Sequence, residues 1–269
     1  MPARPPHEIW EESLDEGERR LGRRVPGLAA TGFAGGADVL FGIVVLFVTA
    51  GALHAAMPEP TAHVLASLTF GIGFAFITLG RAELFTENFL IPVGAVFDGR
   101  STIRALLRMW LVTLVFNLLG LALFAAIFSI KGVLPADALT AAGAGADTLG
   151  DRDALPAFAS AVAAGTVMTL FTWVVAAADR DSARVIASLI IGFVLAAPTL
   201  NHAIVGFGEM VFGILGGEAH SNVGDLVRNT AIAIAGNFVG GVGLVFSTRL
   251  AQVRSEPGTR SGARNGNAR

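Results

Sequence analysis

A histidine interrupts a long apolar run in the second half of the chain. Residues 185–215 are almost wholly apolar, except at the pentapeptide PTLNH, residues 198–202. As one straight helix this run would extend about 46 Å at ~1.5 Å per residue, whereas a bilayer core is only ~30 Å thick. Pro198 also removes a backbone donor and clashes with the preceding helical turn. The sequence therefore predicts two half-helices that meet at an irregular segment near the membrane midplane.

His202 lies at this break. Ionisable groups inside a membrane span are costly, so they mark a pathway unless a neighbouring carbonyl satisfies them. We interpret His202 as a pathway residue that presents a hydrogen-bonding, titratable ring to a small solute, and we assign Asn201 beside it to the same pathway. A histidine that is satisfied by a nearby carbonyl is the alternative interpretation.

A second polar interruption falls in the first half of the chain, where the segment GRAELFTEN, residues 80–88, divides an apolar run. Arg81, Glu83 and Glu87 cannot face lipid, so we expect Arg81 to pair with one of the two glutamates. Paired carboxylates are also suited to acid–base chemistry. However, the sequence offers no accompanying nucleophile, metal-ligand set or phosphate-binding loop. We therefore expect neither an enzyme nor a metal or cofactor.

The composition is that of a membrane protein. Hydrophobic residues make up 53% of the chain, charged residues 15%, and the mean hydropathy is +0.65. The absence of cysteine excludes disulfides and thiolate chemistry, and a net charge of −2 argues against nucleic acid as a partner. The polar N-terminal segment lacks the apolar core of a signal peptide, so the first span is expected to direct insertion.

The apolar segments predict six membrane spans. We expect a cytoplasmic, helical N-terminal segment (1–28), a transmembrane channel domain (29–248) and a disordered cytoplasmic tail (249–269). Most arginines fall in segments that lie on one side of such a bundle, so the positive-inside rule places both termini in the cytoplasm of a bacterial inner membrane. A polar, Gly- and Ala-rich loop is expected at 131–156. The expected spans are 33–56, 64–97 with the interruption at 80–88, 103–130, 157–178, 185–215 and 226–247.

An internal repeat relates the two halves of the chain. The motif Asn-x-x-Gly occurs at Asn117 and again at Asn237, and the two broken spans are separated by a similar interval. Each half contains three spans, so the second copy is inverted in the membrane, and paired interruptions of this kind indicate a permeation site. Asn117 and Asn237 need partners in lipid, which the freed backbone at the breaks could supply. Alternatively, each asparagine simply holds helices together.

These motifs carry a resemblance to a known family. The segment Glu83-Leu84-Phe85-Thr86-x-Asn88, the His202 break and the two Asn-x-x-Gly motifs together resemble the formate/nitrite transporter family. The resemblance covers residues 29–248. It implies an all-α, aquaporin-like fold of two inverted three-span repeats, a homopentamer, and one pore per protomer for small monovalent anions such as formate, nitrite or hydrosulfide.

The resemblance also implies roles for individual residues. His202 matches the family's central histidine, and Asn237 matches a polar residue near it. Two further groups match apolar or narrowing elements of the pore: Phe70 and Phe74, one helical turn apart, match apolar constrictions, and Leu84, Phe85 and Thr86 match a loop on the cytoplasmic side. The sequence departs from the family in having Arg81 at a position that is usually small, Asn-His-Ala in place of Glu-His-Ser at the second break, and no lysine in the fourth span.

Three functions are compatible with these features. The first is a channel or proton-linked carrier for a small monovalent anion, in which apolar rings reject hydrated ions and a buried donor favours a small anion or its neutral acid. The second is a pore for a small neutral solute such as water or an uncharged weak acid. The third is a membrane scaffold or sensor with a closed pore.

Overall fold

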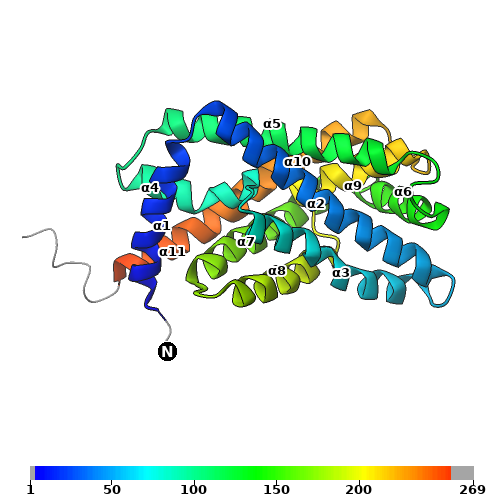
Figure 1. The fold of residues 1–269 in the computed structure, drawn as a ribbon, viewed down its shortest axis with the longest axis horizontal. Coiled ribbons are helices and arrows are strands. Elements are labelled where there is room, and N and C mark those ends of the chain that lie inside the picture. The colour runs from blue at the N-terminus through cyan, green and yellow to red at the C-terminus, as the bar shows by residue number, and fades with distance from the viewer. Residues whose placement is uncertain (1–3, 256–269) are drawn as a thin grey trace, which may run out of the picture.

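The computed structural model describes residues 4–255, and within them the chain is helical without a β-strand (Figure 1). The polar N-terminal segment forms one helix, and the apolar segments form the rest of the bundle. The elements are α1 (Pro6–Leu21), α2 (Val25–His54), α3 (Glu59–Gly80), η1 (Phe85–Phe89), α4 (Ile91–Phe97), α5 (Ile103–Phe128), α6 (Ala136–Gly150), α7 (Ala154–Ala177), α8 (Asp181–Ala196), α9 (Ala203–Gly216), α10 (Val223–Phe238), η2 (Val239–Phe246) and α11 (Ser247–Ser255).

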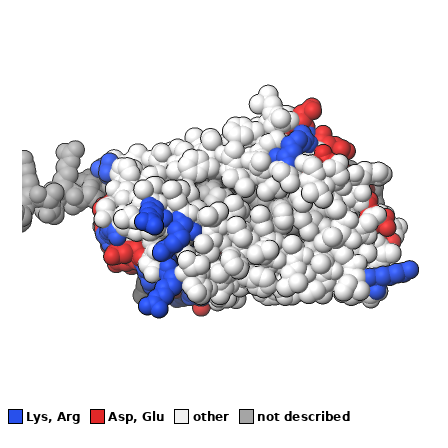
Figure 2. Space-filling model, turned by 90° about the horizontal axis from the view of Figure 1, so that it is seen from above, with Lys and Arg blue, Asp and Glu red and all other residues white. Residues whose placement is uncertain are grey.

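The bundle has the architecture of a multi-pass membrane protein. Helices α2, α3, α5 and α7 and the continuous α10–η2–α11 segment are long and apolar enough to cross a bilayer. The second span continues from α3 through η1 into α4, and the fifth consists of α8 and α9. Charged side chains gather at the two ends of the molecule and leave an uncharged band between them on the visible face (Figure 2). The predicted six spans are therefore present.

Both broken spans bend at a residue with left-handed backbone. Helix α3 is followed by Arg81 with φ of 58°, and α8 is followed by Thr199 with φ of 50°. A positive φ is strained for a residue with a Cβ, most of all for a β-branched one, and such strain clusters at functional sites. The predicted interruptions are therefore real breaks, and each contains one residue other than glycine with a positive φ.

The two broken spans cross each other backbone to backbone. A Cβ atom on Gly192 of α8 would overlap the backbone of Gly71 in α3, and a Cβ on Gly71 would overlap Leu189. Only glycine allows this approach, which replaces the missing hydrophobic drive between helices in lipid with close van der Waals contact. The crossing fixes the two breaks relative to each other.

The predicted loop at 131–156 is wrong in its middle, because residues 136–150 form α6. Alanine is the best helix former, and small side chains allow one face of this helix to lie against α2 and α9. The buried face contains Ala138, Ala142, Ala146 and Leu149. Helix α6 therefore covers one end of the bundle, at the end opposite α1 (Figure 1).

The first and last described helices meet at the other end of the bundle. The predicted N-terminal helix is present as α1, and it contacts α11. The expectation of disorder from residue 249 is wrong for 249–255, because α11 packs through Val253 and through two arginines that lie over aromatic rings. Arg249 lies 5.1 Å from the Trp173 ring and Arg254 lies 4.9 Å from the Phe97 ring. The remainder of the predicted tail lies outside the described residues.

A hydrogen-bonded pair ties α6 to the loop before α10. Asp147 accepts hydrogen bonds from the His220 ring at 2.9 Å and from the backbone N–H groups of His220 and Ser221. Partial burial opposes ionisation of Asp147, but these hydrogen bonds outweigh it and lower its pKa to about 2. The hydrogen bond to Asp147 raises the pKa of the His220 ring above its ordinary value.

This pair predicts a pH dependence of stability. The Asp147 contribution is present above an unfolded pKa of about 4 and is lost as the pH falls through about 2. The charged His220 contribution is complete below an unfolded pKa of about 6.5 and is lost as the pH rises through its raised folded value. His220→Ala should therefore lower the thermal unfolding temperature more at pH ~5 than at pH ~8. Asp147→Asn should destabilise the protein at both pH values, since the backbone N–H donors of His220 and Ser221 lose their charged acceptor. An equal effect of His220→Ala at both pH values would contradict this account.

Candidate functional site

The two breaks meet at a hydrogen bond between Thr86 and His202. The Thr86 Oγ1 and His202 Nε2 atoms lie 2.7 Å apart, and both side chains are fully buried. His202 also caps α9, because the Val205 N–H donates to its Nδ1 at 3.2 Å. An accepting Nδ1 carries no proton, so the neutral ring bears its proton on Nε2 and donates it to Thr86. The hydroxyl proton of Thr86 is then available to a further acceptor.

The phenylalanines predicted for the constrictions lie in a buried apolar cluster. Phe70, Phe74, Phe171 and Leu84 are all fully buried. The Phe70 and Phe74 rings meet edge to face at 5.2 Å, as their one-turn spacing predicts, and Phe74 stacks on Phe171 at 5.7 Å. These residues belong to the same buried cluster of apolar side chains. Such a setting strengthens any polar contact made within it.

Phe85 takes part in a separate aromatic group. Its ring packs on Phe89 at 4.9 Å and on Trp110 of α5 at 6.3 Å. The Trp110 Nε1–H in turn donates to the Asn88 carbonyl at 2.9 Å. These contacts hold the first break against α5, so Phe85 contributes to the position of the Leu84–Thr86 segment.

Asn117 holds the first break in place. Its Oδ1 accepts from the Phe85 N–H at 2.8 Å, and its Nδ2 donates to the carbonyls of Gly32 at 2.6 Å and Glu83 at 2.9 Å. The side chain thus joins α2, α5 and the break. Gly36 allows α2 to approach, because a Cβ there would overlap the Asn117 backbone.

Asn237 holds the second break in the same way. Its Oδ1 accepts from the Ala203 N–H at 2.8 Å, and its Nδ2 donates to the carbonyls of Ala161 at 2.8 Å and Asn201 at 3.1 Å. Gly165 allows the close approach here that Gly36 allows at the first break, since a Cβ at Gly165 would overlap the Asn237 backbone. The freed backbone at each break therefore supplies two partners of each asparagine, as the sequence predicts, and a carbonyl of α2 or α7 supplies the third. Both amides are fully used, which makes them positioning groups.

The Asn201 side chain points to a partner that sequence reasoning did not identify. Asn201 and Asn229 exchange two amide hydrogen bonds, of 2.9 and 3.1 Å, and Asn201 Nδ2 also lies 3.3 Å from the Ala157 carbonyl. This amide pair joins the second break to α7 and α10. Asn201 therefore contacts neighbouring helices through its side chain while its backbone leads into His202.

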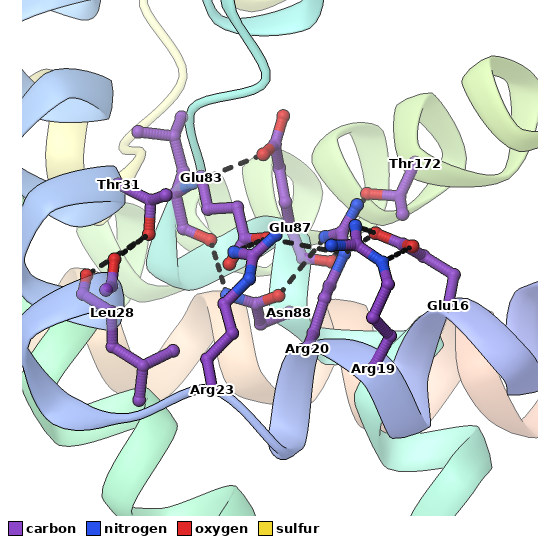
Figure 3. A network of polar contacts seen from close by, with 12 residues as sticks. Glu16, Arg19, Arg20, Arg23, Leu28, Thr31, Glu83, Glu87, Asn88 and Thr172 are labelled. Atoms are coloured by element: carbon purple, nitrogen blue, oxygen red, sulfur yellow. Dashed lines mark hydrogen bonds and ion pairs between the residues drawn. The ribbon is translucent and has the colours of Figure 1, made fainter.

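The charged residues near the first break pair differently from the sequence-based expectation (Figure 3). Glu83 Oε1 lies 2.5 Å from Arg23 and 3.4 Å from Arg20. Glu87 accepts from the Leu84 N–H at 3.2 Å. Arg81 does not pair with either glutamate: its side chain is 69% exposed and lies 3.9 Å from Asp181. Arginines from the end of α1 and its connection to α2 thus take the role expected of Arg81.

The Glu83 pairs predict a clear stability effect. Arg23→Ala leaves a buried carboxylate with one distant partner and an Oε2 atom that already lacks a hydrogen bond, so we expect a loss of about 3 kcal/mol in unfolding free energy. Arg81→Ala and Arg19→Ala should each cost less than about 1 kcal/mol, because both side chains are mostly exposed. Thermal unfolding in detergent measures all three. Equal losses for Arg23→Ala and Arg19→Ala would contradict the assigned pairing.

Two cavities reach the breaks from opposite ends of the bundle. The cavity at the α1 end, which we call the inner cavity, has a volume of about 530 Å³ and touches the first break at Ala82, Glu83 and Glu87. The cavity at the α6 end, which we call the outer cavity, has a volume of about 160 Å³, touches the second break at Thr199 and is lined by Glu209 of α9. Neither is lined by Thr86 or His202. Each cavity therefore reaches one of the two breaks, and the buried Thr86–His202 hydrogen bond joins those breaks.

Arg152, just before α7, supports the strained second break. Its guanidinium donates to the Thr199 carbonyl at 3.2 Å and to the Ser160 hydroxyl at 3.1 Å. The sequence offered only a weak signal for this role, because Arg152 stands in a polar connecting segment. The structure thus places a basic group beside the break although the fourth span itself contains none.

These features define a class: a multi-pass, all-helical membrane protein in which two inverted repeats each bring a broken span to one buried centre. The sequence model of the formate/nitrite transporter family matches residues 7–250. The chain belongs to this family. The family resemblance stated from the motifs is therefore confirmed, as is the aquaporin-like fold.

Relatives with described names are similar over most of the chain. A "Probable formate transporter" of Methanothermobacter thermautotrophicus is 32% identical and the match covers 78% of this chain and 74% of that protein. The "Formate channel BtFdhC" of Bacillus thuringiensis is 23% identical, with 89% and 92% covered. A solved "FNT family ion channel" has a TM-score of 0.78 at 18% identity, covering 93% of this chain and 99% of that one. A "Pentameric formate channel with formate bound" has a TM-score of 0.71 at 18% identity, with 86% and 98% covered.

Proposed function

We propose that this protein is a channel or proton-linked transporter for a small monovalent anion such as formate or nitrite. The observation that carries the proposal is the buried Thr86–His202 hydrogen bond, which joins the two breaks that the inner and outer cavities reach. The names of the relatives, a probable formate transporter and a formate channel, support the same substrate class. We propose no enzymatic reaction and no cofactor.

The chemistry of the central pair suits an anion. The Thr86 hydroxyl accepts a hydrogen bond from the Nε2–H group of His202, and it can donate a hydrogen bond to an anion oxygen. The N-terminus of α9 begins at His202, and the positive end of a helix dipole favours negative charge at a broken span. Phe70, Phe74 and Leu84 are buried, and we assign them to apolar constrictions that a hydrated ion does not cross readily. A small anion thus exchanges its water for a few fixed donors, or crosses as its neutral acid.

The proton state of His202 follows from its cap. A second proton on Nδ1 would break the hydrogen bond from the Val205 N–H, so an imidazolium ring costs the α9 cap. We therefore propose that His202 shares its Nε2 proton through Thr86 with the anion rather than carrying two protons at rest. The proton that accompanies the anion then has another source.

A flux screen tests the proposed function. Purified protein in liposomes is assayed with formate, nitrite, acetate, lactate, hydrosulfide and chloride, and empty liposomes give the background. Flux of one or more small monovalent anions above background is expected. Flux of water or a neutral solute without any anion would support the neutral-solute pore, and no flux of any kind would support a closed scaffold.

We also propose a symmetric pentamer in a bacterial inner membrane, with residues 1–28 and 249–269 in the cytoplasm on either side of the channel domain, 29–248. The solved relative described as pentameric supports the number of copies, and exposed apolar side chains along α5 leave a face for neighbours or lipid. A native mass spectrum in detergent is expected to show five copies. A different stoichiometry would overturn this assignment.

A further inference from the structure

Glu209 is an acidic side chain in the outer cavity that the proposed pathway has not used. It is the one charged residue of α9, and it is 8% exposed. Within residues 4–255 its carboxylate has no hydrogen bond and no ion pair, yet it lines the outer cavity. A buried carboxylate without a donor is costly, and a proton-bearing ligand in the cavity would supply one.

Glu209 lies two helical turns along α9 from its cap, His202. The seven-residue separation corresponds to about 10 Å along the helix axis. The outer cavity also touches Thr199, directly before the Asn201–His202 segment. A solute that enters from the outer end therefore meets Glu209 before it reaches the central pair.

The charges around Glu209 are few. Arg152 acts on it electrostatically but donates its hydrogen bonds to Thr199 and Ser160. His63 lines the same cavity with its Nε2 atom 3.2 Å from the Ala196 and Ala197 carbonyls, and Glu59 and His54 lie at the exposed rim. The remaining titratable residues on elements packed against α9 do not line this cavity; they are Asp38 on α2, Glu87 on η1, Arg104 and Arg108 on α5, Asp137 and Asp147 on α6, and Asp225 and Arg228 on α10.

The central pair can donate a hydrogen bond to the anion through the Thr86 hydroxyl, but it holds no acidic proton that it could transfer to the anion. The Nδ1 atom of His202 accepts from Val205, and its Nε2 proton is engaged with Thr86. A charged carboxylate at Glu209 would repel an approaching anion, whereas the protonated acid can donate to it. The geometry thus separates a proton-bearing group in the outer cavity from a hydrogen-bonding group at the centre.

We propose that Glu209 is the proton-exchange residue of the outer cavity and that it acts on small carboxylate-class anions. The O–H bond of the Glu209 acid breaks, its electron pair stays on the Glu209 oxygen, and a new O–H bond forms on the anion. The neutral acid continues to Thr86 and His202. Hydronium from the outer solution then restores the Glu209 proton. This proposal rests on the proposed anion transport.

The test measures initial formate influx into liposomes between about pH 5 and about pH 8, with empty liposomes subtracted. Wild-type influx is expected to rise as the external pH falls. Glu209→Gln should lose this rise and be at least about tenfold slower than wild type at the acid end, with less than about threefold change at the alkaline end. Glu209→Asp keeps a carboxylic acid and should retain the rise. Glu59→Gln, which removes the same charge from the exposed rim of the cavity, should match wild type.

Each outcome is decisive. A Glu209→Gln profile that matches wild type overturns the proposal, and so does a loss at every pH that Glu209→Asp does not restore. A Glu59→Gln profile that loses the acid rise would also overturn it, because the effect would then belong to the charge of the cavity as a whole. Absence of anion flux in wild type at all pH values would instead overturn the proposed function.

Discussion

Formate flux through the His202→Asn variant is expected to fall at least about tenfold, with the fold retained. Asparagine is a good helix cap, so it can replace the ring as the acceptor of the Val205 N–H. It is shorter and carries no imidazole proton, so the 2.7 Å contact with Thr86 is lost. One hydrogen bond in the path of an anion is worth roughly 1.5–3 kcal/mol, and about 1.4 kcal/mol corresponds to a tenfold change in rate. Flux in liposomes at several pH values measures the effect.

Two variants of Thr86 serve as matched controls. Thr86→Ser keeps the hydroxyl and should transport at a rate near that of wild type. Thr86→Val keeps the shape and removes the hydroxyl, so it should resemble His202→Asn. If His202→Asn has the rate and pH dependence of wild type at equal incorporation, His202 is a structural cap and the donor role assigned to it fails.

The sequence predicted the breaks well because each has a local cause. Pro198 ends α8 near the point where the apolar run exceeds the thickness of a bilayer, and the polar residues after Gly80 end α3. The asparagines were also predictable, since an amide inside a span needs a backbone group that has lost its helical partner. The repeat then placed both on equivalent helices. The breaks and the asparagines could therefore be predicted from hydrophobic periodicity, the length of the apolar runs and the cost of unpaired polar groups in lipid.

The partners of the charged groups were not predictable in the same way. Arg81 stands two residues before Glu83, but its side chain lies at the surface after a left-handed turn. Arg20 and Arg23 instead reach Glu83 from sixty or more residues away. The Asn201–Asn229 pair likewise depends on how α9 and α10 pack. Both sets of partners are determined by the packing of segments that are distant in the sequence, so no local sequence pattern predicts them.

Two other features carried signals that were present but easily misassigned. The polarity of the Ala- and Gly-rich segment 136–150 is typical of a loop, whereas the spacing of its small residues is typical of a packed helix. The segment forms the helix α6. Glu209 stands alone in an apolar half-helix, the pattern that singles out a functional carboxylate in a membrane span. A role for Glu209 can be inferred only when the structure shows the outer cavity that it lines and the hydrogen bonds that engage both nitrogens of His202.

Removing either positioning asparagine is expected to have the largest effect on stability. Asn117→Leu keeps a side chain of similar volume but leaves the Phe85 N–H and the Glu83 carbonyl buried without a partner. The Gly32 carbonyl loses its bond to Asn117 but keeps its helical partner within α2. Each of the two unsatisfied groups costs about 1–3 kcal/mol, so the unfolding free energy should fall by roughly 2–6 kcal/mol. Asn237→Leu should cause a similar loss, because it releases an equivalent set at the second break. Thermal unfolding in detergent and the fraction of intact oligomer measure both.

The matched control lies one helical turn before Asn117. The Thr113 hydroxyl is buried without a hydrogen bond, so Thr113→Val removes an unpaired polar atom at constant shape and should be neutral or slightly stabilising. Asn117→Asp keeps the acceptor for the Phe85 N–H and loses both donors, so it should fall between wild type and Asn117→Leu. If Asn117→Leu is as stable as Thr113→Val, the first break is held by the aromatic contacts of Phe85 and by the Arg23–Glu83 pair, and the asparagine is secondary to them. If only one asparagine proves essential, the two breaks have different mechanical roles, and the symmetry of their hydrogen bonds does not extend to their energetics.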